Sequence, residues 1–182
     1  MNILVTGASG LIGRALVPHL EKSGHTVIAA VRRTPKSAAE RQWDPAAGTL
    51  SDGFFDGVDA VIHLACISND PSFELNPDLG RSINLDAFVP LVRAAKAEKV
   101  KRFIYASSSS VYGIKDGAPI TEGATLAPVS DYNKTKMCAE RITLSYADRM
   151  HLSIVRPATV CGMYPRMRLD TMVNMLTVQA LK

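Results

Sequence analysis

The sequence predicts a doubly wound α/β fold, in which helices cover both faces of a parallel β-sheet. Three observations carry this prediction. Short runs that are apolar throughout alternate with longer segments of helical spacing. A cluster of glycines follows the first apolar run directly, and no internal repeat or low-complexity stretch interrupts the alternation. In a fold of this class, a ligand is expected beyond the carboxyl ends of the strands.

The first elements are two strands separated by one helix. Residues 2–5 form a short apolar run, which predicts a buried strand. Residues 11–22 carry apolar side chains at helical spacing, and Ser23-Gly24 after them is typical of a helix C-terminus. Residues 26–31 form the second strand. After it the pattern weakens, and only a short strand near residues 41–43 is expected.

The remainder of the chain repeats the alternation and adds one long loop. Its strands share the fully apolar character of the first strand, and its helices present apolar residues on one face. The expected elements are strands at 59–64, 102–106 and 152–155, helices at 77–98, 131–149 and 170–181, and a loop at 107–125 that contains glycine and proline.

Composition indicates one ordinary globular domain over residues 1–182. Of these residues 47% are apolar and 21% are charged, which is enough for a substantial core. The net charge of +4 is spread over dispersed basic residues that are not interleaved with aromatic ones, so no nucleic-acid partner is expected. No apolar run is long enough to cross a membrane.

Cysteine and histidine usage predicts a cytoplasmic protein without a metal site. The odd number of cysteines lacks CxxC spacing, and the N-terminus has no signal-peptide pattern. Histidines are scattered without metal-ligand spacing, so core or surface roles are expected for them. The residues concerned are Cys66, Cys138 and Cys161, and His19, His25, His63 and His151.

The glycines between the first strand and the first helix predict a dinucleotide-binding turn. Gly7 permits the tight turn, Gly10 lets the backbone approach a pyrophosphate, and Gly13 lets the helix pack closely on the strand. The amides around Leu11 and Ile12 then face the phosphates at the positive end of the helix dipole. A purely structural turn is the alternative. The strand–turn–helix setting favours a Rossmann nucleotide site.

The end of the second strand bears on the choice of cofactor. An acidic residue there would bind the adenosine ribose and favour NAD, but the chain has Arg32 and Arg33 and no carboxylate close in sequence. The planar guanidinium of Arg32 can pair with a 2′-phosphate. We therefore expect NADP rather than NAD. The alternative is that both arginines simply face solvent.

A serine-rich segment and a tyrosine–lysine pair form a candidate acid–base site. Tyr132 and Lys136 are four residues apart in a predicted helix, so their side chains share one face. The ammonium, together with a positive nicotinamide, is expected to lower the pKa of Tyr132 from about 10. A serine hydroxyl from residues 107–110, at the end of the strand 102–106, can bridge a substrate oxygen and Tyr132. The alternative is an ordinary surface helix.

Several motifs in this order resemble one protein family. The segments TGASGLIG, DAVIHLA, YASSSSVYG, YNKTK and RPATVCG, with Asn84 on its helix, are together highly specific. The chain resembles the extended short-chain dehydrogenase/reductase superfamily and its NAD-dependent epimerase/dehydratase group. The resemblance implies that Ser108, Tyr132 and Lys136 are catalytic, with Lys136 also binding the nicotinamide ribose.

Cofactor contacts are expected from the glycine turn, the arginines and the resemblance together. The resemblance implies contacts after the fourth strand, on the Asn84 helix and after Arg156, and a contact between Asp44 and adenine. The full set expected to bind the cofactor is Gly7, Gly10, Leu11, Ile12, Gly13, Arg32, Arg33, Asp44, Leu64, Ala65, Asn84, Tyr132, Lys136 and Pro157.

The resemblance also bears on the reaction and on the partner. Dehydratases of this group carry an Asp-Glu pair where this chain has Ser109 and Ser110, which disfavours 4,6-dehydration. Epimerisation or ketone reduction of a nucleotide sugar is therefore expected. Extended members hold the sugar nucleotide in a smaller C-terminal domain, and this chain reaches Lys182 without it. The alternative function is a catalytically idle NADP-binding or interaction module.

A cluster of methionines points to self-association. Methionine side chains are flexible and polarisable, and they are common at adaptable contact surfaces. If their helix is exposed, they can form an apolar patch that pairs two copies of the chain. We therefore expect a homodimer in which the patch is formed by Met163, Met167, Met172 and Met175.

Overall fold

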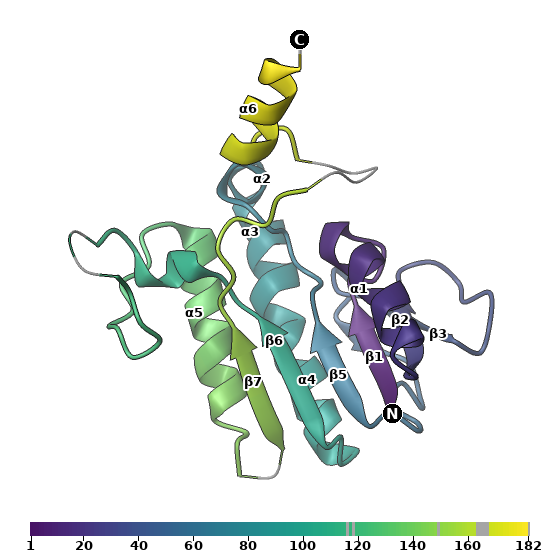
Figure 1. Ribbon diagram of the computed structural model, residues 1–182. Coiled ribbons are helices and arrows are strands. Elements are labelled where there is room, and N and C mark those ends of the chain that lie inside the picture. Colours follow the sequence, from purple (N-terminus) through teal and green to yellow (C-terminus); the bar gives the residue numbers. More distant parts are fainter. Residues whose placement is uncertain (116, 118, 149, 163–167, 182) are drawn as a thin grey trace.

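A computed structural model describes residues 1–115, 117, 119–148, 150–162 and 168–181 (Figure 1). Seven strands of this described part form one sheet, in the order β4-β3-β2-β1-β5-β6-β7. Every neighbouring pair from β3 to β7 is parallel, and β4 is antiparallel to β3. The strands are β1 Asn2–Thr6, β2 Thr26–Val31, β3 Glu40–Asp44, β4 Thr49–Leu50, β5 Ala60–His63, β6 Arg102–Ala106 and β7 His151–Val155.

Helices cover both faces of this sheet, which confirms the predicted doubly wound α/β fold. One face carries α1, and α4 and α5 lie on the other, while α6 lies beyond the carboxyl ends of the strands at the top of Figure 1. The helices are α1 Leu11–Lys22, α2 Asp70–Glu74, α3 Pro77–Arg81, a π-helix Ser82–Asp86, α4 Phe88–Ala97, a 3₁₀-helix Ser109–Tyr112, α5 Asp131–Leu144 and α6 Met172–Ala180.

The two faces of β1 bury two separate apolar clusters. Leu4 belongs to the larger cluster, which includes Phe88 and Leu91 of α4. Ile3 and Val5 point to the opposite face, where α1 packs. Side chains of successive strand residues alternate between the faces, so a strand that is apolar throughout fills both clusters. This explains why the sequence pattern of the central strands is continuous rather than alternating.

The sequence located α1, β2 and β6 at their observed bounds, but it missed short elements. It did not predict α2, the antiparallel strand β4 or the 3₁₀-helix Ser109–Tyr112. The helix expected at 131–149 ends earlier, at Leu144, and residue 149 lies outside the described residues. The last helix begins at Met172 rather than 170. Elements of two to five residues are fixed by tertiary contacts more than by local pattern.

The helix predicted at 77–98 is divided. It consists of α3, the π-helix and α4 in succession, and the amide of Ala87 donates to the carbonyl of Ser82, five residues earlier. Pro90 follows in α4 and has no amide to donate to the carbonyl of Asp86. The interruption matters for the site because it places Asn84 within the π-helix.

The expected methionine patch is only partly within the described residues. Met172 and Met175 lie on α6 with 67% and 39% of their surfaces exposed. Met163 and Met167 lie outside the described residues, so the homodimer stays a prediction. None of the helices described here is long and apolar enough to cross a membrane.

His63, at the end of β5, is a core residue, as predicted. Its ring stacks 5.9 Å from that of Tyr105, and its Nδ1 lies 2.9 Å from the hydroxyl of Thr6. The pKa of His63 is lowered from 6.5 to about 3, mainly by burial and in addition by the nearby positive charge of Lys136. The folded protein therefore keeps this imidazole neutral at a pH where the unfolded chain protonates it.

This difference predicts a pH dependence of stability. Between pH 6.5 and 3 only the unfolded state takes up the proton, so His63 makes the free energy of unfolding fall as the pH falls, by about 1.4 kcal/mol per pH unit. In urea unfolding between pH 7 and 4, His63→Gln should therefore lose less stability on acidification than the natural chain. Replacing the exposed His151 with Gln is the matched control and should not change the slope. Parallel pH curves for His63→Gln and the natural chain would contradict the prediction.

Candidate functional site

The candidate site begins where the carboxyl ends of β1 and β5 lie side by side. Here the order of the sheet reverses, because β2 follows β1 on one side and β5 leads to β6 on the other. The hydroxyl oxygen of Thr6, the last residue of β1, accepts hydrogen bonds from the amides of Leu64 and Ala65 at 3.1 and 3.2 Å. Its own proton then points to Nδ1 of His63. Thr6 thus fixes the start of the segment after β5.

The glycine turn packs directly on that segment. Gly7 has a φ of +70°, and a Cβ at this position would lie 2.8 Å from the amide nitrogen of Ala65. A Cβ on Gly13 would lie 2.3 Å from the carbonyl oxygen of Gly7. Gly10 donates its amide to the same carbonyl at 2.9 Å. The turn therefore tolerates no side chain at Gly7 or Gly13, and the backbone itself forms the surface of the site.

The start of α1 is suited to an anion. Its N-cap, Gly10, supplies no side-chain hydrogen bond, and no acidic residue lies in its first turn. By contrast, Ser130 caps α5 by accepting the amide of Asn133. The first amides of α1, at Leu11 and Ile12, therefore have no side-chain acceptor and stand at the positive end of the helix dipole. A pyrophosphate fits this arrangement.

The arginines after β2 differ in what they contact. Arg33 forms a two-pronged pair with Glu40, with its Nη1 2.8 Å from Oε2 and its Nη2 2.5 Å from Oε1. The sequence showed no carboxylate close to these arginines, and the pairing of β3 with β2 is what brings Glu40 there. Arg32 is exposed, and its side chain has no hydrogen bond or ion pair with any described residue. Only Arg32 is thus free to meet a ligand.

Asp44 and Asn84 occupy different positions relative to the turn. Asp44 is the last residue of β3 and lies two residues beyond Gln42, which pairs with the end of β2. The Asp44 carboxylate accepts the amide of Ala46 at 3.0 Å. Asn84 is buried and holds the backbone of Ile67 with both ends of its amide, at 2.8 and 3.0 Å. Asn84 therefore fixes the segment that leaves β5 past Ala65.

Ser108, Tyr132 and Lys136 converge at the carboxyl end of β6. Ser108 caps the 3₁₀-helix that follows β6, and its hydroxyl lies near enough to the Tyr132 phenol to influence its pKa. The ammonium of Lys136 donates to the carbonyl of Ala106 at 2.8 Å and lies 5.8 Å from the centre of the Tyr132 ring. Tyr132 and Lys136 are 8% and 3% exposed, so both are nearly withdrawn from water. The geometry suits proton transfer to or from an oxygen beside Tyr132.

Hydrogen bonds continue from Ser108 to a second serine and an asparagine. Oγ of Ser110 donates to Oδ1 of Asn133 at 2.5 Å. Because the Ser110 proton is used there, Ser108 donates to Ser110 across 2.7 Å. The result is a chain of hydrogen bonds from Ser108 through Ser110 to the side-chain amide of Asn133.

The protein groups around Tyr132 raise its pKa, contrary to the expectation from sequence. Burial of the phenol is the largest cause, and the nearby Cys66 and Asp70 add to it. Arg168 and the nearby Ser108 hydroxyl lower the pKa but do not outweigh burial. The expected lowering by Lys136 was wrong because that ammonium is directed at a backbone carbonyl rather than at the phenol oxygen.

A pocket of about 240 Å³ opens beside Tyr132. Its walls come from α2 and from the residues just before α5, and they include Phe73, whose ring lies 6.4 Å from that of Tyr132. A larger cavity of about 660 Å³ lies at the opposite, amino end of the strands near Lys101 and His151. Only the smaller one adjoins the acid–base residues, so we regard it as the substrate side of the site.

Comparison with known proteins identifies the family. The model of the NAD dependent epimerase/dehydratase family matches residues 3–181. The chain belongs to this family. An uncharacterised UDP-glucose epimerase of Bacillus subtilis strain 168, YtcB, is 32% identical over 100% of this chain and 63% of its own length.

Solved structures of NAD complexes have the same fold. UDP-glucuronic acid 4-epimerase from Bacillus cereus, in complex with NAD, is 30% identical, with a TM-score of 0.81 over 100% of this chain and 63% of that protein. MoeE5, in complex with UDP-glucuronic acid and NAD, is also 30% identical, with a TM-score of 0.81 over 97% of this chain and 60% of that protein. The chain therefore spans less than two thirds of the length of these family members.

Several residues of this family member's site were not found from sequence. Thr6 and Asn133 act through partners that are distant in the chain, and Glu40 meets Arg33 only through the pairing of β3 with β2, so no local pattern marks them. Glu140 lies one helical turn after Lys136, a spacing that could have drawn attention to it. The expected residue Pro157 follows β7, where its carbonyl accepts the amide of Ser109 at 2.9 Å.

The packing of the glycine turn predicts an unequal effect of two similar substitutions. Gly7 and Gly24 have φ of +70° and +81°, but a Cβ at Gly24 meets nothing within 4 Å. Gly24→Ala should cost only the backbone strain of about 1–2 kcal/mol. Gly7→Ala should destabilise the fold further and weaken binding of NADH and NADPH about 10-fold or more, because the backbone near Ala65 must move. Urea unfolding and fluorescence titration measure both effects, and equal losses in the two variants would contradict the prediction.

Proposed function

We propose that the chain is the cofactor-binding and catalytic part of an NAD(P)-dependent epimerase or reductase that acts on a nucleotide sugar. Ser108, Tyr132 and Lys136 are its catalytic residues. The observation that carries the proposal is the contact between Ser108 and Tyr132 at the carboxyl end of β6, next to a glycine turn that fits a pyrophosphate. Membership of the family and the NAD-bound relatives support it.

In the proposed mechanism, these residues hold and move one proton. A bound nicotinamide supplies the hydride acceptor or donor. Tyr132 exchanges the proton of the substrate hydroxyl, and Ser108 holds the same oxygen by a hydrogen bond. Lys136 keeps a positive charge beside the ring and is held in place by the carbonyl of Ala106. Ser109 and Ser110 stand at the positions of the acidic pair that elimination requires, so the proposal is epimerisation or ketone reduction.

The substrate class is proposed from the relatives and from the pocket. MoeE5 was solved with UDP-glucuronic acid, and YtcB is named for UDP-glucose. Tyr132 is one of the residues that line the pocket, so a sugar bound there would lie next to this residue. We therefore propose that a sugar linked to a nucleoside diphosphate enters there.

For the cofactor we propose a preference for NADP over NAD. Arg32 is exposed and free of side-chain partners among the described residues, while Glu40 occupies Arg33. A free guanidinium at the end of β2 offers a forked donor to a 2′-phosphate. The relatives solved with NAD show that the family also accepts the unphosphorylated cofactor.

We also propose a cytoplasmic location. All three cysteines are free thiols, and two of them, Cys66 and Cys138, are partly buried on the elements that form the site. A reducing compartment keeps such thiols unpaired.

The role of Tyr132 predicts a separation of turnover from binding. Tyr132→Phe removes the hydroxyl that exchanges the proton but keeps the buried ring, so turnover of UDP-glucose or UDP-glucuronic acid should fall by about 10²-fold or more. Affinity for the cofactor should change little. Tyr146→Phe, a matched change after the end of α5, should keep full turnover. Absorbance at 340 nm and analysis of the sugar product measure turnover.

Two outcomes would count against the assignment. Full activity in Tyr132→Phe would eliminate Tyr132 as the acid–base residue. Cofactor binding by the natural chain without turnover on any nucleotide sugar would favour the second candidate, a catalytically idle NADP-binding or interaction module.

The proposed role of Arg32 predicts a loss of affinity for NADPH but not for NADH. Arg32→Gln removes the charge, so NADPH should bind about 10-fold more weakly, which corresponds to the loss of a charge-assisted hydrogen bond. NADH binding should be unchanged. Arg33→Gln is the paired comparison and should leave the ratio of the two affinities alone, because Arg33 is engaged by Glu40. An equal effect of Arg32→Gln on both cofactors would refute the proposed preference.

A further inference from the structure

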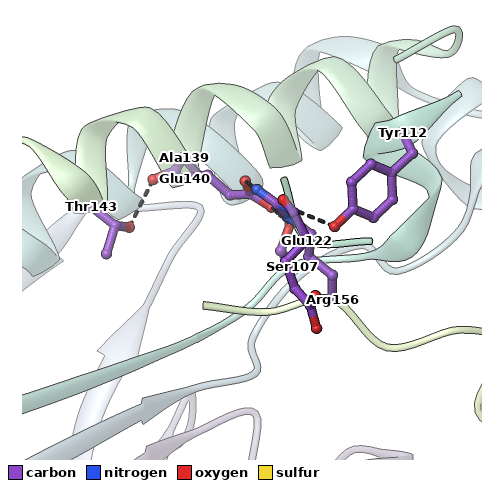
Figure 2. A network of polar contacts seen from close by, with 7 residues as sticks. All are labelled: Ser107, Tyr112, Glu122, Ala139, Glu140, Thr143 and Arg156. Carbon is purple, nitrogen blue, oxygen red and sulfur yellow. Dashed lines mark hydrogen bonds and ion pairs between the residues drawn. The ribbon is translucent and has the colours of Figure 1, made fainter. Parts of the chain in front are cut away.

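A buried carboxylate lies next to residues 107–112, which we call the serine turn. It takes no part in the proposed mechanism. Glu140 is 1% exposed and stands one turn after Lys136 on α5. Its Oε1 accepts the hydroxyl proton of Ser107, the residue immediately before Ser108. Figure 2 shows the carboxylate between this serine and Arg156. Glu140 therefore reaches the site through a neighbour of the catalytic serine.

Arg156 holds this carboxylate with two nitrogens and uses the third for the turn. Nε and Nη2 donate to the two oxygens of Glu140 at 2.9 and 2.6 Å. Nη1 donates to the hydroxyl of Tyr112 at 2.8 Å and to the carbonyl of Glu122 at 3.1 Å (Figure 2). The guanidinium also lies 5.0 Å from the centre of the Tyr112 ring. The ion pair thus hydrogen-bonds both ends of the turn, Ser107 through Glu140 and Tyr112 through Arg156.

Backbone hydrogen bonds hold the turn on both sides of Ser108. The amides of Ser107 and Ser109 donate to the carbonyls of Val155 and Pro157 at 2.8 and 2.9 Å, so the turn continues alongside the segment that carries Arg156. Ser108, between them, has extended φ and ψ of −154° and 145°, and its side chain points to Ser110 and Tyr132. A small rotation of the turn would therefore move the Ser108 hydroxyl.

A buried ion pair is a poor device for stability alone. Apolar side chains of similar volume often stabilise a core as well as a buried pair does, because the charges lose their hydration. Apart from the bond between Nη1 and the carbonyl of Glu122, the hydrogen bonds of the pair join its two members to each other or to the serine turn. The arrangement suits a device that fixes orientation.

We propose that Glu140 and Arg156 are positioning residues that hold Ser107 and Tyr112 and thereby fix Ser108 against Tyr132. The proposal rests on the proposed roles of Ser108 and Tyr132 as the acid–base pair. It adds that their contact depends on an ion pair that touches neither substrate nor cofactor.

The test reads the environment of the Tyr132 oxygen directly. The 182-residue chain is labelled with tyrosine carrying ¹³C at Cζ, and the Tyr132 resonance is assigned by its loss in Tyr132→Phe. Ser108→Ala gives the reference shift for a broken serine–tyrosine contact. Ser107→Ala, Tyr112→Phe and Glu140→Gln should each move the resonance in the direction of that reference. When any of them is combined with Ser108→Ala, no further shift should appear, because both changes act on one contact.

A matched control separates positioning from general loss of core stability. Thr143 lies on the same helix as Glu140, is fully buried and donates to the carbonyl of Ala139 at 2.7 Å, away from the turn (Figure 2). Thr143→Val should lower the urea midpoint and leave the Tyr132 resonance in place. If Glu140→Gln does not fold, Ser107→Ala and Tyr112→Phe decide the question, since both leave the ion pair intact.

The results of this test can be told apart from the results that test the proposed function. The resonance is measured without cofactor or turnover, so an inactive chain still gives the answer. Folded variants with the natural resonance, or shifts that add to that of Ser108→Ala, would overturn the positioning role. Where the chain turns over a nucleotide sugar, the same variants should lower kcat and leave KM near its natural value, and a loss confined to KM would also overturn it.

Discussion

The carboxyl ends of β1 and β5 are joined by one buried hydroxyl, and the geometry of the site depends on that junction. Thr6 accepts the amides of Leu64 and Ala65 and faces Nδ1 of His63, so the segment after β5 is fixed to the end of β1. Gly7 can then pack its backbone against Ala65 without room for a side chain. A hydroxyl left unsatisfied at this depth would cost about 1–3 kcal/mol, and so the three partners are as necessary as the glycines.

Burial sets the protonation states around this junction. Lowering of the pKa of His63 and raising of that of Tyr132 have the same main cause, the removal of water from the charged form. The consequence is a neutral imidazole under the turn and a protonated phenol beside it. In the protein alone, Tyr132 is therefore equipped to donate a proton, and its acceptance of one depends on additional positive charge near the ring. The positive charge of an oxidised nicotinamide is of the required sign.

The sequence predicted the parts of the structure that depend on local pattern. The doubly wound sheet, the glycine turn and the shared face of Tyr132 and Lys136 follow from periodicity and spacing, and the structure has all three. It could not show that Glu40 binds Arg33, because that contact requires the pairing of β3 with β2. It also missed the division of the helix around Asn84, where tertiary contacts and Pro90 override helical spacing. The direction of the pKa shift at Tyr132 was wrong for a related reason, since burial is a property of the whole fold.

Two separate sets of hydrogen bonds hold the polar groups of the site, one at the carboxyl end of β1 and one at the carboxyl end of β6. Each set needs only a few residues. On the side of β1, backbone amides and glycines form the surface that we propose for a dinucleotide, and Thr6 and Asn84 fix that surface. On the side of β6, the Glu140–Arg156 pair fixes the serine turn. Tyr132 and Lys136 lie between the two on α5, a helix of 14 residues that is anchored by its own cap at Ser130. Because each half is fixed by its own hydrogen bonds, a change in one half can alter the proposed cofactor binding or the proposed proton transfer separately, which agrees with the different roles that we propose for Arg32 and Ser108.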